Sequence, residues 1–277
     1  PYLLPCANGV LDLKTGDMRP GRPDDMLLKA CPVAWEGIDA PCPTWEQTVQ
    51  EIMSENETLC NFVQRFFGFA LIGEVSQSVF VIMTGQGRNG KSMLVNTIFD
   101  ILGPLARAIR PEMLLDQGRV SNSAGPSADI MALKGARFVF GSETDEGCRI
   151  SSSRVKWLTG NDVLSARSPN DKYEINFRPT HTLFLLTNHV PNTPTDDFAF
   201  WERVLIIPFN LSFVNREPRA DNERRADRDL PAKLREELPG ILAWALRGCL
   251  EWRHSDLWTP SGSRGALGFA LGVASHG

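Results

Sequence analysis

The chain has 277 residues and a formal net charge of −4, with 42% hydrophobic and 22% charged residues. These proportions are those of an ordinary globular protein, and they exclude a disordered or fibrous class. No stretch reaches the roughly 18 uncharged apolar residues of a membrane-spanning helix, so we expect a cytoplasmic protein without a membrane partner. Because the charge is slightly acidic, any nucleic-acid contact must be local. The chain begins at Pro1 and not at Met, and we expect a piece of a longer protein.

The first part of the chain divides into two patterns. Residues 1–45 combine Pro and Gly with short apolar runs, which predicts a small strand-and-turn element. Residues 44–71 carry apolar side chains at three-to-four spacing, which predicts a pair of helices. We therefore expect an N-terminal domain over residues 1–72.

The middle of the chain alternates between strand and helix patterns. A nearly all-apolar run at residues 78–83 ends at a glycine-rich loop, and residues 92–102 are periodic and apolar again. Three further apolar runs, at residues 137–142, 182–187 and 204–209, predict buried parallel strands. The prediction is an α/β fold with a parallel sheet, in which residues 73–213 form the core.

The end of the chain is predicted to be helical. Residues 216–229 are dense in Arg, Asp and Glu, which is typical of a solvated segment. Residues 230–252 are predicted to be helical, with their apolar side chains on one face. We expect a C-terminal helical segment over residues 214–260, followed by a tail at residues 261–277 that is disordered or truncated.

The glycine-rich loop carries a phosphate-binding pattern, G-x-x-x-x-G-K-[ST]. In such a loop the backbone N–H groups point at phosphates, and the following helix adds the positive end of its dipole. Lys91 would reach the β- and γ-phosphates of ATP, and Ser92 would hold Mg²⁺. An ordinary glycine-rich turn is the alternative. The residues predicted to bind the nucleotide are Gly85, Gln86, Gly87, Arg88, Asn89, Gly90, Lys91, Ser92 and Met93.

An acidic segment follows the predicted strand at residues 137–142. We expect that strand to lie beside the phosphate strand, with Glu143 at its end holding Mg²⁺. Asp145 falls on the same face as Glu143 by strand alternation, so it or Glu146 is a candidate for the base that orients the attacking water. The alternative is that residues 145 and 146 are only turn residues before Gly147.

Several short segments together carry a resemblance to a known group of proteins. The segments are Asn89–Ser92, Ser142–Thr144, Val155–Asp162, Arg178–His181, Leu186–Pro191, Trp201–Phe209 and Leu234–Trp244. They resemble the superfamily 3 helicases, within the branch that contains the C-terminal helicase domains of phage and plasmid primases, of the P4 type, and the poxvirus D5-like proteins. The resemblance covers roughly residues 6–255.

This resemblance implies a phosphate-loop core of the AAA+ type that assembles as a ring, usually a hexamer. Such a ring hydrolyses ATP between its subunits and pulls on single-stranded DNA, or on the strand of a DNA fork, in a central channel. It further implies a role in replicating a phage, plasmid or mobile element, inside a bacterial or phage-infected cell. A primase domain or a separate primase would be a partner.

The resemblance also assigns individual residues. Asn188 lies where the family has its sensor asparagine, although asparagine at a strand end is also a common turn residue. Arg203 is fifteen positions after Asn188 (203 − 188), close to the distance at which the family has its arginine finger. An arginine finger is supplied by a neighbouring subunit and contacts the γ-phosphate. The alternative for Arg203 is a salt bridge to Glu202 or Asp197. Lys156 is a candidate second basic sensor.

A hairpin is predicted over residues 165–173, with its turn at residues 169–171. In the resembling family this hairpin enters the channel and places basic residues against the DNA backbone. Lys172 is the leading candidate for that contact, and Arg167 and Tyr173 are the next candidates. An exposed hairpin with incidental charge is the alternative.

Other functions fit part of the sequence. A phosphate-loop ATPase of this kind can remodel or recruit protein partners without moving along DNA. A domain that only binds nucleotide and serves as an assembly platform is a further alternative. Many superfamily 3 proteins place two adjacent acids after the second strand, whereas here Thr144 follows Glu143, so the identity of the catalytic base stays open.

Overall fold

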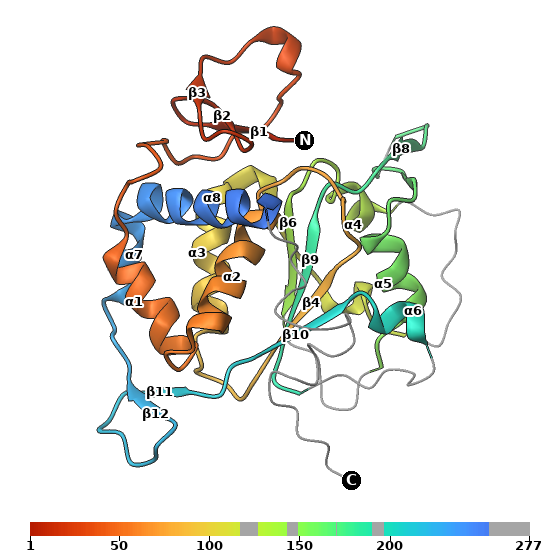
Figure 1. Ribbon diagram of the computed structural model, residues 1–277. Coiled ribbons are helices and arrows are strands. Elements are labelled where there is room, and N and C mark those ends of the chain that lie inside the picture. The colour runs from red at the N-terminus through yellow and green to blue at the C-terminus, as the bar shows by residue number, and fades with distance from the viewer. Residues whose placement is uncertain (117–126, 143–148, 170, 190–196, 255–277) are drawn as a thin grey trace. The chain divides into compact units, whose positions relative to one another are not determined.

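The computed structural model describes residues 1–116, 127–142, 149–169, 171–189 and 197–254 (Figure 1). Contacts between Cα atoms divide the chain into two compact units. Of the described residues, the helical unit contains 1–72, 85–106 and 209–254, and the sheet unit contains those within 73–84 and 107–208. Both units are discontinuous in sequence, so the domain boundaries predicted near residues 72, 213 and 260 stay predictions.

The helical unit begins with the predicted strand-and-turn element. Strands β1 (Leu3–Cys6), β2 (Gly9–Asp12) and β3 (Met18–Arg19) form an antiparallel sheet in that order. The short 3-10 helix η1 (Pro23–Asp25) follows. Leu4 and Leu11 are fully buried, so this small sheet has an apolar face.

The described residues of the helical unit also contain five α-helices: α1 (Pro43–Ile52), α2 (Glu57–Ala70), α3 (Lys91–Leu102), α7 (Leu230–Glu236) and α8 (Leu238–His254). The helices α1 and α2 confirm the predicted helical pair. Helices α2 and α8 cross closely, because a Cβ atom on Gly68 would lie 2.2 Å from the backbone N of Cys249. Trp45 and Trp244 meet edge to face with ring centroids 5.3 Å apart, a geometry that aromatic pairs favour.

Residues 230–252 are helical as predicted, and the structure divides them into two helices, α7 and α8. Pro239 lies in the first turn of α8, where a missing N–H costs nothing, but it cannot continue a preceding helix. Glu237, at the junction, accepts hydrogen bonds from the backbone N of Thr44 (3.0 Å) and Trp45 (2.9 Å). The break therefore places a carboxylate at the N-terminus of α1, where the helix dipole favours negative charge.

The helical unit also contains a 3-10 helix, η2 (Gly103–Leu105), and two short strands, β11 (Ser212–Val214) and β12 (Glu223–Arg225), which pair in parallel. Among the described residues, no helix is both long enough and apolar enough to cross a bilayer.

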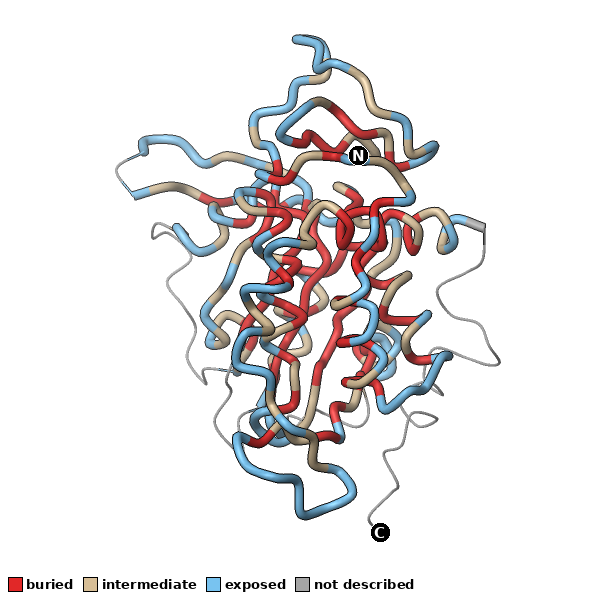
Figure 2. The backbone as a smooth tube through the Cα atoms, turned by 90° about the vertical axis from the view of Figure 1, so that its left-hand side faces the viewer, coloured by how far each residue is buried: buried red, intermediate tan, exposed pale blue. Residues whose placement is uncertain are grey.

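The sheet unit is built on a five-stranded sheet of β10 (Val204–Pro208), β4 (Phe80–Thr84), β9 (Thr182–Thr187), β6 (Phe138–Ser142) and β5 (Ala106–Ile109), in that order. Parallel pairing joins β10 to β4, β4 to β9, and β9 to β6. The four apolar runs of the sequence are therefore confirmed as strands. Most residues of β4, β6, β9 and β10 are buried, and Figure 2 colours the buried positions of the chain red.

One expectation about this sheet is wrong. The strand that precedes Glu143 does not lie beside the phosphate strand, because β9 lies between β6 and β4. Both neighbours of β4, namely β9 and β10, come later in the chain than β6. Connections between parallel strands cross over the sheet, so order along the sequence does not fix order in space.

The sheet unit also contains short helices and a two-stranded hairpin. The helices are α4 (Ala128–Met131), α5 (Ser152–Thr159), α6 (Phe198–Trp201) and the 3-10 helix η3 (Pro111–Met113). The hairpin strands are β7 (Leu164–Ala166) and β8 (Ile175–Phe177). Their apolar residues join those of the strands in one core. Phe80, Val139 and Leu185 are examples from the strands, and Val155 and Phe200 are examples from the helices. These α/β features agree with the fold class predicted from the sequence.

Candidate functional site

The glycine-rich loop starts at the residue after β4 and ends in the first turn of α3. Its backbone takes positive φ at Gly85 (152°), Arg88 (63°) and Gly90 (90°). A Cβ atom on Gly85 would lie 2.2 Å from the carbonyl oxygen of Phe209. Position 85 therefore requires glycine for both its conformation and its close approach to another segment.

The segment after β10 holds the loop in place. The backbone N of Phe213 donates to the carbonyl oxygen of Arg88 at 2.7 Å. Asn89 is 3% exposed, and its Nδ2 donates to the carbonyl oxygen of Phe209 at 3.4 Å. The exposed residues of the loop are Gln86, Gly87 and Arg88. Phe209 and Phe213 were missed by sequence reasoning, and the only signal for them was the end of the apolar run at residue 209.

Lys91 is the charged residue of this loop. Its side chain is buried, with 6% of the residue exposed, and its Nζ donates to the carbonyl oxygen of Gly85. Burial lowers the pKa of Lys91 to about 8, because removing an ammonium group from water disfavours its charged form. A buried ammonium group at the N-terminus of a helix attracts anions strongly.

The loop residues fit a phosphate group and its metal. Gly90 precedes α3 and Lys91 begins it, so the N–H groups of the first helical turn, which have no acceptor within the helix, follow the loop directly. That of Lys91 donates to the Oδ1 of Asn89 at 3.4 Å. Ser92 is exposed on that turn, and its hydroxyl could hold Mg²⁺, which prefers oxygen ligands and would supply positive charge beside the phosphates. Met93, also predicted to contact the nucleotide, is half-buried on the same turn.

In the sheet unit, Asn188 directly follows β9 and is exposed. Thr187, the last residue of β9, pairs in register with Thr84, the last residue of β4. Since parallel strands end at the same edge of a sheet, Asn188 lies at the carboxyl edge, where ligands of open α/β sheets bind. Glu143 and Asp145 lie outside the described residues. Their predecessor Ser142 ends β6, paired with Leu186 at the same edge.

Arg203 lies at the opposite edge of the sheet. It precedes β10, and its carbonyl oxygen accepts a hydrogen bond at 2.7 Å from the backbone N of Phe80, the first residue of β4. The five residues of β10 span about 16 Å. Arg203 is therefore about that far from the carboxyl edge of its own sheet. In the described part of the chain its Nε is buried without a hydrogen-bond partner, while its Nη1 donates to Ala199.

Asp197 does not form the ion pair with Arg203 that was one alternative. Instead its carboxylate accepts from the Nζ of Lys156 at 2.8 Å and from the backbone N of Phe200, which caps α6. The hydrogen bond from Lys156 is the largest cause of a lowered pKa at Asp197. Lys156, a candidate basic sensor, is thus engaged with a carboxylate of the sheet unit.

The predicted hairpin is confirmed. Strands β7 and β8 pair antiparallel from Leu164 opposite Phe177 to Ala166 opposite Ile175. Lys172 is exposed in the loop that joins them, and Tyr173 beside it is 81% exposed. Asn170, in the predicted turn, lies outside the described residues.

Arg167 differs from these two side chains. It is half-buried at the start of the hairpin loop, and its backbone N donates to the Oγ of Ser127 at 3.2 Å. The hairpin therefore presents Lys172 and Tyr173 to solvent, while Arg167 is held at its base.

Comparison with known proteins finds one matching family model and several viral relatives. A family model described as "D5 N terminal like" matches residues 1–54. A protein of Acanthamoeba polyphaga mimivirus that is named a helicase is 28% identical over 271 residues, which cover 94% of this chain and 28% of that protein. A protein of Frog virus 3 (isolate Goorha), also named a helicase, is 24% identical over 90% of this chain and 32% of its own length.

A protein of African swine fever virus that is named a primase is 23% identical over 82% of this chain and 24% of its own length. The chain thus spans about a third or less of these relatives. Among solved structures, the C-terminal region of NrS-1 has the same fold, with a TM-score of 0.57 and 14% identity over 88% of this chain and 53% of that one.

The chain thus shares an α/β fold with the C-terminal region of NrS-1, and in sequence it is similar to viral proteins named helicases and primases. These matches agree with the resemblance to D5-like primase–helicases that its short segments predicted.

Proposed function

We propose that this chain hydrolyses ATP and uses the energy to move along DNA during replication. Its viral relatives are named helicases and primases, which supports a role of that general kind. The single observation that carries the hydrolysis is the buried lysine, Lys91, inside a strained glycine loop at the start of a helix. Such a buried cation calls for an anionic ligand, and phosphate is the ligand that this backbone geometry fits.

Each residue of the proposed hydrolytic site has a separate role. Lys91 binds the β- and γ-phosphates, and Ser92 with Glu143 holds Mg²⁺. Asn188 hydrogen-bonds the γ-phosphate or the attacking water, which its neutral amide suits because it can donate and accept. Asp145 remains our candidate for the base that orients that water.

The position of Arg203 supports hydrolysis between copies of the chain. A guanidinium at the amino edge of the sheet is a strand length away from the carboxyl edge of the same sheet. We therefore propose that Arg203 acts on the nucleotide of a neighbouring copy in a ring, with a hexamer as the proposed size.

The hairpin is the proposed contact with DNA. Lys172 would bind the phosphate backbone and Tyr173 would stack on a base, and both contacts are independent of sequence, as movement along a strand requires. Arg167, half-buried at the base of the hairpin, would add positive charge behind them.

The test is ATP hydrolysis by the purified chain with and without single-stranded DNA, using the variants Lys172→Ala and Arg203→Ala. Lys233→Ala is the control, because Lys233 is an exposed lysine in a surface ion pair with Asp227. We expect DNA to stimulate hydrolysis in the wild type and in the control but not in Lys172→Ala. We expect Arg203→Ala to be nearly inactive in both conditions.

A mixing experiment separates the role of Arg203 in a neighbouring copy from a role in its own. Inactive Arg203→Ala mixed with inactive Lys91→Ala should recover hydrolysis, because some interfaces then combine an intact loop with an intact arginine. Robust hydrolysis that ignores DNA and Lys172 would instead indicate an ATPase that remodels or recruits proteins.

A further inference from the structure

Helix α6 is a single turn of four residues, and Arg203 lies two residues after it. The backbone N of Arg203 donates to the carbonyl oxygen of Phe200 at 2.9 Å, and its Nη1 donates to the carbonyl oxygen of Ala199. Both acceptors belong to α6, so the position of this turn sets the direction of the guanidinium. One turn of helix is not stable by itself in water. Contacts with neighbouring elements must therefore hold α6 in place.

The first contact of α6 is apolar. Phe200 is fully buried and belongs to the core of the sheet unit. The centroid of its ring lies 6.4 Å from that of Phe80 on β4 and 5.5 Å from that of Trp201. This burial fixes how deeply the turn is inserted in the core. A single buried ring does not by itself fix the direction of the turn about that ring.

The second contact is an ion pair at the N-terminus of α6. Both carboxylate oxygens of Asp197 accept from the Nζ of Lys156, at 2.8 and 3.2 Å. The same carboxylate caps the helix, since its Oδ1 accepts from the backbone N of Phe200 at 3.0 Å. Lys156 lies on α5, which contacts α6 (Figure 1) and is anchored in the core by Val155 and Leu158. The ion pair thus gives α6 a second fixed point.

This ion pair is better suited to direct α6 than to stabilise the fold. The side chains of Lys156 and Asp197 are 34% and 20% exposed, and partly exposed pairs contribute little to the free energy of unfolding. Breaking the pair should therefore leave the protein folded while α6 and Arg203 shift. A shift of about 1 Å in a group that acts on the reacting atoms can lower a rate by about 100-fold.

We propose that Lys156 and Asp197 are positioning residues for Arg203. Their ion pair holds α6 against α5, and α6 directs the guanidinium at the nucleotide of a neighbouring copy. Neither residue contacts the nucleotide in this arrangement, so Lys156 is not a basic sensor. This inference rests on the proposed function, and it adds how the arginine is aimed.

The first test compares the kinetics of Lys156→Met and Asp197→Asn with those of the wild type. Methionine keeps an unbranched side chain without the charge, and asparagine keeps the cap on α6 without the ion pair. For both variants we expect the kcat of ATP hydrolysis to fall by about 10- to 100-fold, with the KM for ATP and the midpoint of urea unfolding unchanged. Lys156→Arg, which can still pair with Asp197, should retain most of the activity. Lys233→Met, which breaks the surface ion pair with Asp227, is the matched control and should equal the wild type.

The second test mixes pairs of impaired variants and measures the recovery of hydrolysis. Lys156→Met should recover when it is mixed with Lys91→Ala, because its loop is intact and the other copy supplies a correctly directed arginine. It should not recover with Arg203→Ala, because neither copy then supplies such an arginine. A lysine that acts as a basic sensor in its own site predicts the reverse pattern.

The outcomes separate this inference from the proposed function. An unchanged kcat in Lys156→Met, or its recovery with Arg203→Ala, would overturn the positioning role alone. A loss of kcat that is accompanied by an equally large effect on urea unfolding in both Lys156→Met and Asp197→Asn would do the same, because the pair would then serve stability. If Arg203→Ala and Lys91→Ala do not recover hydrolysis when mixed with each other, the proposed action of Arg203 on a neighbouring copy fails instead.

Discussion

The glycine loop and the β7–β8 hairpin are built in opposite ways. The loop depends on buried groups, since Asn89 is 3% exposed, Lys91 is 6% exposed and Gly85 touches the backbone of Phe209. The hairpin exposes its candidate functional side chains, including Tyr173 at 81%. A phosphate site made of backbone groups needs one particular conformation, whereas contact with a DNA backbone needs only charge within reach. Changes to the loop backbone should therefore alter structure and activity together, whereas changes to the exposed side chains at the tip of the hairpin should alter activity alone.

Lys91→Met is expected to have the largest effect on activity. Losing the cation that contacts the transferred phosphate should lower ATP hydrolysis by at least about 100-fold, the usual cost of removing one group that stabilises a transition state. The free energy of unfolding at pH 7 should stay the same or rise, because burial already disfavours the charged lysine. Hydrolysis and urea unfolding measure the two effects. A large loss of stability would mean that Lys91 serves mainly to hold the loop.

Gly85→Ala tests the backbone of the loop. The new Cβ would lie 2.2 Å from the carbonyl oxygen of Phe209, at a φ of 152° that other residues rarely adopt. We expect a cost of about 1–3 kcal/mol in the free energy of unfolding. Gly87→Ala is the matched control, since a Cβ atom there meets nothing within 4 Å. Equal stability of the two variants would show that the contact with Phe209 does not constrain the loop.

The pH dependence of ATP affinity should follow Lys91. The pKa of Lys91 is lowered to about 8 by burial, and bound phosphates favour the charged form, so the complex keeps the proton at a pH where the free protein has lost it. Above pH 8 the dissociation constant should therefore rise up to about ten-fold per pH unit. Calorimetry between pH 7 and 9.5 measures this slope. Lys91→Met should lack the slope, and a flat wild-type curve would contradict it.

The sequence predicted the strands of the sheet better than their order. Residues 182–187 were predicted without error, because a strand buried on both faces is continuously apolar. Strand β5 was missed, since it is only four residues long and includes Arg107. The placement of β9 between β4 and β6 depends on contacts distant in sequence, and no local pattern encodes them.

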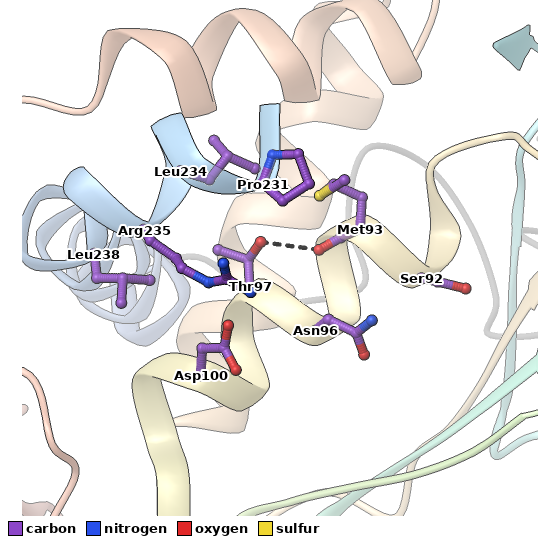
Figure 3. A pocket seen from close by; sticks show the side chains of 9 residues that line it. All are labelled: Ser92, Met93, Asn96, Thr97, Asp100, Pro231, Leu234, Arg235 and Leu238. Carbon is purple, nitrogen blue, oxygen red and sulfur yellow. Dashed lines mark hydrogen bonds between the residues drawn. The ribbon is translucent and has the colours of Figure 1, made fainter. Parts of the chain in front are cut away.

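The candidate site shows the same limit. The glycine spacing identified Lys91 and Ser92, because the conformation of the loop is a local property. The residue that braces it, Phe209, is 120 positions from Asn89, and an apolar residue at a strand end carries no mark of that role. A cavity between α3 and α7, lined by Asn96 and Asp100 among others (Figure 3), was not predicted either, because these two look like ordinary surface residues of a helix until α7 lies opposite them.

Lys172→Gln should affect DNA binding alone. Removing one contact with a phosphate of single-stranded DNA should lower the slope of log affinity against log salt by about 0.7. The unfolding free energy should not change, because Lys172 is exposed. Fluorescence anisotropy with a labelled oligonucleotide at several salt concentrations gives the slope, and Lys233→Gln is the control. An unchanged slope would remove Lys172 from the DNA contact.

The smallest effect is expected from Ser165→Ala, which removes an exposed hydrogen bond of 2.9 Å across the hairpin to Glu174. Such surface changes usually stay within about 0.5 kcal/mol of the wild-type free energy of unfolding. The neighbouring Leu164 is fully buried, and Leu164→Ala should cost about 2–5 kcal/mol. Thermal and urea unfolding of both variants would show whether buried side chains at its base anchor the hairpin while its remaining residues add little. If Ser165→Ala lowered the free energy of unfolding by more than about 1 kcal/mol, outside that usual range, the conformation of the hairpin would depend on its exposed contacts. The contrast between the hairpin and the glycine loop would then fail.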